Sequence, residues 1–222
     1  MAKESELTAS TLTKLEEINA KNTVASIDKN NNLLKNIFED KNRTVLADIE
    51  AQRVIAAMDE TVRKDRARSI TIMTHADGTV SVGLAGDIDS SKSIEIIKRT
   101  QAQLDKMYGK GQYTVGTTTL NGDDGIVFIG DNRPGMCGEG KCAQAAAQNP
   151  SPVTGFAVAW RGKGPVPHPY TGANKDSLSP NQMGFCATCS DPQNQAIYSN
   201  TANKNKTLQS NTINTTNKRL DP

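Results

Sequence analysis

Hydrophobic residues in the first 68 positions recur at the spacing of helices rather than strands. Apolar residues stand three or four positions apart, and no glycine or proline precedes Gly78. This spacing brings the apolar side chains onto one face of a helix, in a narrow stripe that suits an arm or linker packed against another surface. It predicts a helical segment over residues 1–68, whose stripes contain Leu12, Leu15, Ile18, Leu34, Ile37, Phe38, Val45, Leu46, Ile49 and Met58.

From Ser69 onward the pattern becomes that of strands. Residues 69–74 and 79–84 each alternate, and Ala76-Asp77-Gly78 between them is a turn signal. The two runs therefore predict a hairpin, with His75 beside a surface turn. Further along, we expect helices at 90–108, 142–148 and 186–198, and strands at 113–120, 126–129 and 155–160.

Two stretches of the C-terminal half lack a regular pattern. Residues 161–184 are rich in Pro, Gly and Asn, and a loop of this length is usually functional or disordered. From Ser199 the chain has almost no apolar residues, which predicts a disordered tail over 199–222. We therefore expect a helical segment at 1–68, a folded domain at 69–198 and a tail.

Composition narrows the possible functions. The formal net charge is only +2, which argues against a highly basic nucleic-acid coat protein but leaves room for a local basic groove. No apolar run is long enough to cross a bilayer, and the N-terminus lacks the layout of a secretory signal. The chain has four cysteines, clustered in pairs, and in a reducing compartment that arrangement favours a metal over disulfides.

The cysteines lie in two short segments, GMCGEGKCAQAAA and MGFCATCSDPQ. The second holds Cys186 and Cys189, whose spacing allows two thiolates to chelate one zinc ion. A redox dithiol has the same spacing but usually follows the first strand of a βαβ unit, so the spacing here favours zinc.

The first segment offers two ways to place a third ligand. Zinc deaminases carry a ligand at the start of a helix and a glutamate two residues later, so that both face one pocket. Cys142 with Gln144 has this spacing and begins a run of strong helix formers. Cys137 with Glu139 has it too and keeps a carboxylate, but its neighbouring glycines make a poor helix start. We prefer the Cys142 register.

With a strand and then CxxC following the first motif, the chain resembles the cytidine deaminase-like superfamily, in particular the deaminase domains of bacterial polymorphic toxins. The resemblance covers residues 69–198 and implies a three-layer α/β fold, a mixed sheet flanked by helices. It implies zinc bound by Cys142, Cys186 and Cys189, with position 144 as general acid/base. Gln144 cannot take a proton, so this copy would be disabled, either by an introduced substitution or as a natural inactive relative.

The resemblance also implies substrates and partners. The substrate would be cytosine in nucleic acid, in single-stranded DNA first and RNA second, and a cognate immunity protein would bind the toxin. The protein would be made in a bacterial cytoplasm and delivered to act in the cytoplasm of a target cell. Four side chains are candidates for substrate contact: Asn132, Trp160, His168 and Tyr170.

A second hypothesis is a binding domain without catalysis. If Cys137 were a fourth ligand, the four cysteines would close the coordination sphere of zinc, and the site would be structural. In that case Gln144 would have no special meaning. A redox or other hydrolytic effector is a third interpretation.

Overall fold

The central feature of the fold is the hairpin predicted after Ser69. In this computed structural model, which describes residues 33–62 and 67–217, strand β1 (Arg68–His75) pairs antiparallel with β2 (Val80–Leu84). Gly78 in the connecting turn has a φ of 83°, a conformation that glycine adopts without steric cost. The predicted hairpin is thus confirmed.

Two more strands complete a mixed sheet of order β3-β2-β1-β4. Strand β4 (Val153–Arg161) is antiparallel to β1, whereas β3 (Tyr113–Val115) is parallel to β2. The expected strand at 113–120 is shorter than predicted, because α4 crosses the chain at Gly116. A Cβ at Gly116 would lie 2.4 Å from the carbonyl oxygen of Lys141.

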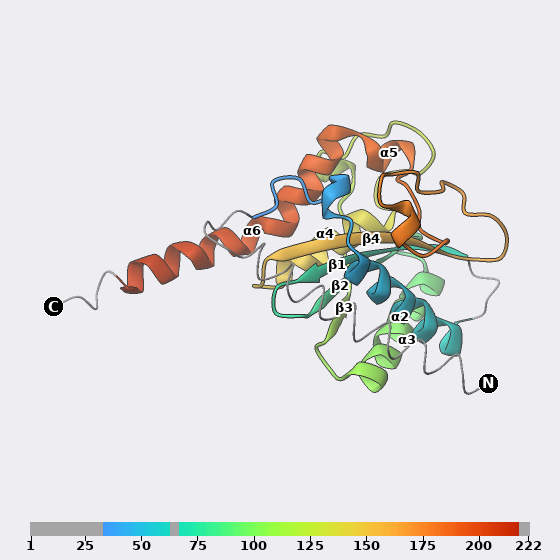
Figure 1. Ribbon diagram of the computed structural model, residues 1–222, viewed down its shortest axis with the longest axis horizontal. Helices are drawn as coiled ribbons and strands as arrows, with labels where there is room; N and C mark the ends of the chain where they lie inside the picture. The colour runs from blue at the N-terminus through green and yellow to red at the C-terminus, as the bar shows by residue number, and fades with distance from the viewer. Residues whose placement is uncertain (1–32, 63–66, 218–222) are drawn as a thin grey trace. The chain divides into compact units, whose positions relative to one another are not determined.

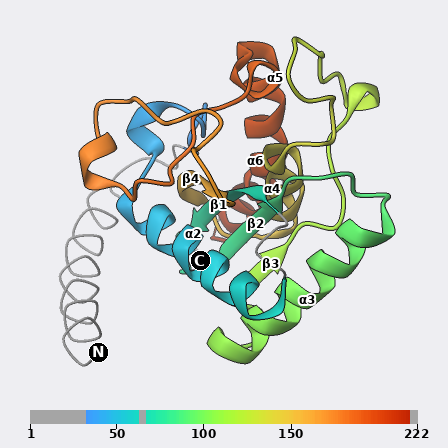
Figure 2. The ribbon, with the colours of Figure 1, turned by 90° about the vertical axis from the view of Figure 1, so that its right-hand side faces the viewer.

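Helices cover both faces of this sheet (Figure 2). One face packs against α2 and α3, through the apolar side chains of β2 and alternate residues of β1 and β4. The other face packs against α4, and α4 in turn packs against α6. The chain therefore has an α/β fold with a mixed sheet flanked by helices. These helices are α2 (Val45–Thr61), α3 (Ser91–Tyr108), α4 (Gly138–Gln148) and α6 (Pro192–Asn217) (Figure 1).

Short helical turns occupy the connections. The predicted helix at 186–198 is divided in two, because α5 (Ala187–Ser190) ends before Pro192 begins α6. Residues 126–129 form no strand, since side chains from α5 and α6 bind their backbone groups instead. The remaining turns are η1 (Asp40–Asn42), η2 (Gly122–Asp124) and η3 (Lys175–Ser177).

The segments that flank the expected domain differ from the sequence prediction. Helix α2 belongs to the main hydrophobic core, and the contacts group Leu33 onward as one compact unit, with no boundary at residue 68. Where a disordered tail was expected, α6 continues to Asn217, and Ser199, Ala202 and Lys206 are buried. The stripe at Leu12, Leu15 and Ile18 lies outside the described residues.

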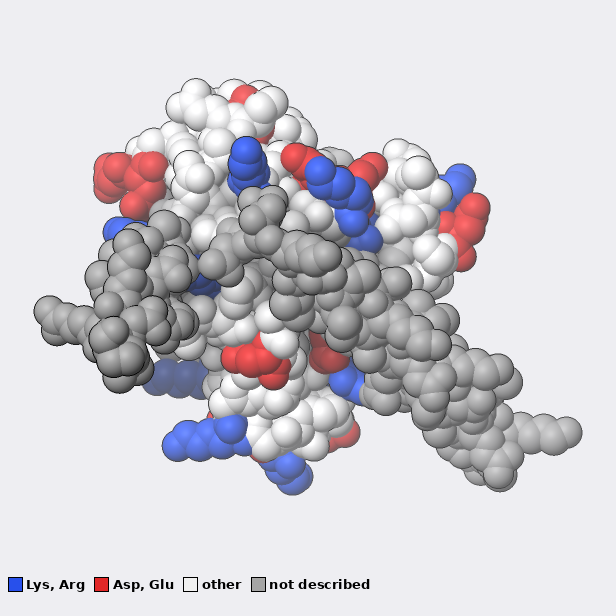
Figure 3. Space-filling model, turned by 60° about the vertical axis from the view of Figure 1, so that its left-hand side comes forward, with Lys and Arg blue, Asp and Glu red and all other residues white. Residues whose placement is uncertain are grey.

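The surface adds two constraints on function. Among the described residues, no helix combines the length and the apolarity needed to cross a bilayer. On the face drawn in Figure 3, basic and acidic side chains are intermixed rather than separated by sign. The described residues visible in this view therefore form no extended basic surface of the kind that binds nucleic acid through phosphates alone.

Helix α4 lies unusually close to β2, and glycines make this approach possible. A Cβ on Gly83 would lie 1.9 Å from the carbonyl oxygen of Gly138 and 2.7 Å from the amide nitrogen of Cys142. Both atoms are backbone, so the helix itself would have to move. The next β2 residue on this face is Ser81, which is also small, whereas Val80 and Val82 pack on the opposite face.

We therefore expect Gly83→Ala to lower the free energy of unfolding by about 1–3 kcal/mol, the usual cost of overpacking. Gly122→Ala is the matched control, since a Cβ there meets nothing within 4 Å. Urea denaturation followed by circular dichroism measures both. Equal midpoints for the two variants would show that the close contact does not limit stability.

His75 is not a surface turn residue, which corrects the sequence prediction. Its ring is 3% exposed. Because a carbonyl oxygen can only accept, Nδ1 donates to the carbonyl oxygen of Ser151 at 2.9 Å, and Nε2 accepts from Ser81 Oγ at 2.8 Å. Burial, with Lys206 nearby, lowers the pKa of His75 from 6.5 to about 4, against smaller raising effects of the hydrogen bond to Ser151 and of Asp77.

This shift predicts a loss of stability in mild acid. Below pH 6.5 the unfolded chain takes up a proton on His75 that the folded chain rejects until about pH 4, so stability falls across that window. Between pH 7 and pH 5 the wild type should lose about 2 kcal/mol more than His75→Gln. Denaturant titrations at both pH values test this, and parallel losses in the two proteins would contradict it.

Candidate metal centre

Three cysteine thiols converge at one end of the sheet. The Sγ atoms of Cys137, Cys186 and Cys189 all lie within 4.8 Å of one another, and those of Cys137 and Cys186 are 3.5 Å apart. Thiolates bound tetrahedrally to one zinc at about 2.3 Å would be about 3.8 Å apart. The spacing and the sulfur donors therefore fit a zinc ion.

The three thiols are positioned by the starts of two helices. Cys137 is the N-cap of α4, with extended backbone, and Cys186 is the N-cap of α5. Cys189 lies one turn further along α5, so both thiols of the CxxC pair face the same point. The N-terminus of α4 adds a partial positive charge near Cys137, whereas the hydrogen bond with Cys186 and burial raise the pKa of the Cys137 thiol.

Helix α4 starts four residues before the predicted start at Cys142, and packing explains the difference. Gly138 is poor in a helix by propensity, but a Cβ there would lie 2.7 Å from both Gly83 O and Thr71 Oγ1. Gly140 is similarly confined, since its Cβ would lie 3.2 Å from Thr119 Oγ1. The close packing of α4 on its neighbours therefore requires glycine at positions where helix propensity disfavours it.

Cys142 is consequently not part of the cluster. Its side chain is fully buried in the core under the sheet, and its Sγ donates to the carbonyl oxygen of Ser81 at 3.3 Å. Burial raises the pKa of the Cys142 thiol, so it stays neutral. The structure thus brings Cys186 and Cys189 together as predicted, but with Cys137 in place of Cys142. Within the described residues, the cluster is a set of three cysteines.

With Cys137 as the first cysteine of the cluster, the residue two positions further along is Glu139 rather than Gln144. Glu139 stands two residues after Cys137, in the first turn of α4, and is 4% exposed. Its Oε2 has no hydrogen-bond partner among the described residues. Desolvation raises the pKa of Glu139 to about 7. Gln144 lies more than a turn further along the helix, is half-buried, and does not belong to the cluster.

Among the three cluster thiols, only Cys186 has a lowered pKa, because hydrogen bonds with neighbouring thiols raise the pKa values of Cys137 and Cys189. The pKa of Cys186 is lowered, first by its hydrogen bond with Cys137 and next by that with Cys189. The side chain of Asn132 also bonds this thiol and lowers its pKa further. Asn132, predicted as a substrate contact, therefore lies beside a thiol of the cluster.

The loop around Asn132 is tied to α5 by side chains. Asp131, with a φ of 59°, accepts from the amide of Ala187 at 2.8 Å. Thr188 Oγ1 donates to the carbonyl oxygens of Gly130 at 2.6 Å and Asn132 at 2.9 Å. These bonds fix the start of α5, and with it Cys186.

Asn194 holds the next part of this loop. Its side chain accepts from the amide of Val127 and donates to the carbonyl oxygens of Val127 and Thr188. Sequence reasoning missed Asn194, and only its position just after Pro192, in the first turn of a helix, could have indicated it. Three successive apolar residues of the loop stay exposed: Val127, Phe128 and Ile129.

The other predicted substrate contacts have structural roles or lie apart. The Tyr170 ring covers the Arg43 guanidinium at 4.1 Å, and its hydroxyl donates to Asn174 Oδ1. The half-buried His168 accepts from the amide of Gly184 through its carbonyl oxygen, at 2.7 Å. Trp160 packs against the core that holds the cluster, and its buried Nε1 has no partner in the described part of the chain.

The 161–184 loop, expected to be functional or disordered, is held by a buried network. Arg43 donates to Gln182 Oε1 at 2.8 Å and to the carbonyl oxygen of Met183 at 2.9 Å. Asp48 accepts from Gln182 and from Ser179. Because Met183 is three residues before Cys186, this network also restrains the approach to the CxxC pair.

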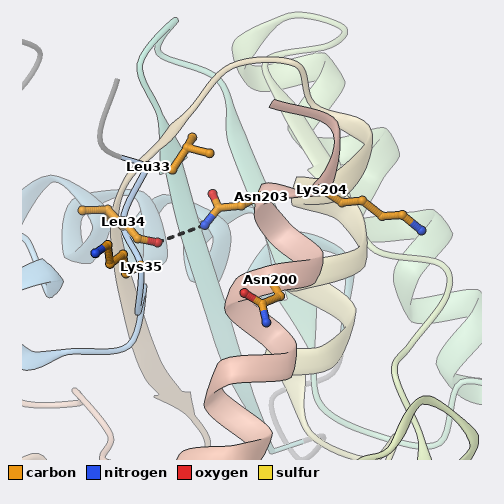
Figure 4. Close-up of a pocket in the computed structure, with 6 residues that line it drawn as sticks. All are labelled: Leu33, Leu34, Lys35, Asn200, Asn203 and Lys204. Carbon is orange, nitrogen blue, oxygen red and sulfur yellow. Dashed lines mark hydrogen bonds between the residues drawn. The ribbon is translucent and has the colours of Figure 1, made fainter. Parts of the chain in front are cut away.

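A pocket of about 280 Å³ lies elsewhere, between the start of the described chain and α6 (Figure 4). Asn203 Nδ2 donates across it to the carbonyl oxygen of Leu34 at 2.9 Å. No cluster cysteine contributes to its lining, which is Leu33, Leu34, Lys35, Asn200, Asn203 and Lys204. The thiol cluster, and not this pocket, is therefore the candidate functional site.

Comparisons of the chain with protein-family models, with curated proteins and with solved structures find no match.

The geometry predicts which cysteine matters for metal. Cys137→Ser should abolish tight zinc binding, because it removes one of three thiolates, whereas Cys142→Ser should retain one zinc per chain. Elemental analysis of the purified proteins gives the stoichiometry, and the sulfur-to-metal charge-transfer band of the cobalt form reports the thiolate ligands. The opposite pattern, with zinc lost only in Cys142→Ser, would show that Cys142 is the ligand, as the sequence analysis preferred.

Proposed function

We propose that this protein is a zinc-dependent deaminase that acts on cytosine in nucleic acid. One observation carries the proposal: three convergent thiols with a buried carboxylate two residues after the first of them. Zinc deaminases require this combination, because three ligands leave the fourth position of a tetrahedral ion to water and the glutamate moves the protons. With Glu139 in that position, the proposed enzyme is intact rather than disabled.

The order of elements supports the proposal. The β1–β2 hairpin precedes the helix with the first ligand, and β4 and the helix with the ligand pair follow. This is the order that the resemblance to deaminases implies, with α3 and β3 between the hairpin and α4.

The proposal gives each of these residues a chemical role. Cys137, Cys186 and Cys189 would hold zinc, which when bound supplies an activated water for attack on the ring carbon that bears the amino group. Glu139 would receive the two protons of the attacking water in turn at Oε2, passing one to the ring nitrogen beside the reacting carbon and the other to the exocyclic nitrogen. The carbon–nitrogen bond then breaks, ammonia leaves, and a carbonyl remains on the ring, so cytosine becomes uracil.

The choice of substrate rests on the resemblance. The target base would have to be unstacked or already single-stranded to reach the buried Glu139, which favours single-stranded DNA first and RNA second. A cognate immunity protein and delivery to a target cell remain predictions.

A structural zinc module fits the geometry less well. The four-cysteine form would need Cys142 as its fourth ligand, but Cys142 donates instead to a β2 carbonyl oxygen within the core. We therefore favour an open site over a closed one.

The proposal predicts that the wild-type protein converts cytosine to uracil in a single-stranded oligonucleotide, and that Glu139→Gln lowers the rate at least about 100-fold, the usual contribution of a general acid/base. Zinc content should stay unchanged, since Glu139 is not a ligand. Uracil excision and strand cleavage measure the product in DNA, and sequencing measures it in RNA.

Gln144→Glu is the matched control and should leave the rate unchanged within about twofold, because position 144 is away from the thiols. Zinc-loaded wild-type protein that deaminates neither DNA, RNA nor free cytidine would overturn the proposal. Activity that appears only in Gln144→Glu would show that the other register is the catalytic one.

A further inference from the structure

Lys141 is a buried lysine whose three donors are all engaged near the thiol cluster. Its side chain is 1% exposed. Nζ donates to the carbonyl oxygens of Gly86 and Gly135, each at 2.8 Å, and of Cys137 at 3.2 Å. An ammonium group has three donors, so these bonds use its full capacity.

The three acceptors belong to the segments that meet at the first ligand. Gly86 follows β2, Gly135 lies in the loop before α4, and Cys137 caps that helix. The loop and the β2 end are also joined by a backbone bond from Gly86 to the carbonyl oxygen of Met136 at 2.7 Å. Lys141 therefore links the backbone of a proposed ligand residue to the chain at the end of β2.

Simple core packing does not account for a lysine here. Burying an ammonium group is costly unless it is well bonded, and an apolar side chain of similar size would usually stabilise a core better. The ligand set supplies a reason for the charge. Three thiolates around a divalent cation carry one net negative charge, and an ionised Glu139 next to them adds a second.

We propose that Lys141 is a positioning residue for the metal centre: it fixes the Cys137 backbone and balances the negative charge of the thiolate-bound metal. This inference rests on the proposed zinc site and adds a residue that neither the ligand spacing nor the acid/base role requires. Outer partners of metal ligands commonly contribute about 10–100-fold to metal affinity.

The test compares two buried lysines in the full-length chain. Lys141→Met keeps length and apolar volume but removes the donors and the charge. Lys206→Met is the control, because Lys206 is 4% exposed and its Nζ donates to Ala202 within α6. Zinc affinity is measured by competition with a chromophoric chelator, and the cobalt forms are compared by their visible spectra. Circular dichroism and thermal unfolding report the fold.

We expect Lys141→Met to weaken zinc binding about 10–100-fold and to shift the cobalt bands, and Lys206→Met to stay within about twofold with an unchanged spectrum. Lys141→Gln, which keeps a neutral donor, should fall between wild type and Lys141→Met, and it decides the question if Lys141→Met does not fold. Wild-type affinity and spectrum in the folded Lys141 variants would overturn the inference.

Two other outcomes would also overturn it. An equal loss of zinc affinity in Lys206→Met would show that removing any buried lysine has this effect. Unfolding of both Lys141 variants would show that Lys141 is needed for the stability of the fold rather than for the metal centre. If the wild type itself binds no zinc, the proposed function fails first, and this inference fails with it.

Discussion

The close approach of α4 to β2 is the contact on which the rest of the site depends. Gly83 and Gly138 let two backbones meet where any side chain would hold them apart. That contact allows the helix to begin at Gly138, and the helix start then determines that Cys137 is its cap and that Glu139 lies in its first turn. A helix that began at Cys142 would present a different set of side chains to Cys186 and Cys189.

The ligands are held mainly by tertiary contacts. Cys137 depends on Lys141 and the end of β2, while Cys186 depends on Asp131 from a loop more than fifty residues earlier in the chain. The bond from Lys141 to Cys137 is local to α4, but the bonds from Lys141 to Gly86 and from Ala187 to Asp131 join segments far apart in the chain. The three thiols therefore converge only in the folded protein. Binding of a metal ion by these thiols would therefore be coupled to folding and would stabilise the elements that bring the thiols together.

Sequence patterns predicted the parts of this fold whose information is local. The hairpin from Ser69, the helix ending at Gly109 and the strand through Phe156 follow from alternation, helical spacing and turn chemistry. The CxxC pair was also found, because its spacing alone lets two thiols meet. His75 was misplaced because its partners, Ser81 and Ser151, come from other elements.

The prediction of a disordered C-terminal tail was wrong for a related reason. A stretch poor in apolar residues resembles a disordered tail, yet Ser199, Ala202 and Lys206 are buried in the described part of α6. Small and polar side chains suffice where one helix packs closely on another, and composition does not reveal that the partner is present. Tyr170 likewise looked available for a base, whereas Arg43, distant in sequence, covers its ring.

The register of the first motif shows why one residue changes the functional interpretation. Cys137 and Cys142 are five residues apart, as are Glu139 and Gln144, and five residues of α-helix correspond to a rotation of about 140° and a rise of about 7.5 Å. The side chains of the two registers cannot face the same pocket. The register that supplies the proposed ligand therefore also supplies the proposed acid/base residue.

Helix propensity favoured the later start of the helix because Gly138 and Gly140 are weak helix formers. Side chains on a helix point back toward its N-terminus, which lets Lys141, four residues after Cys137, reach the carbonyl oxygen of the cap. The earlier start is therefore supported by packing from the sheet and by a side chain of the helix itself.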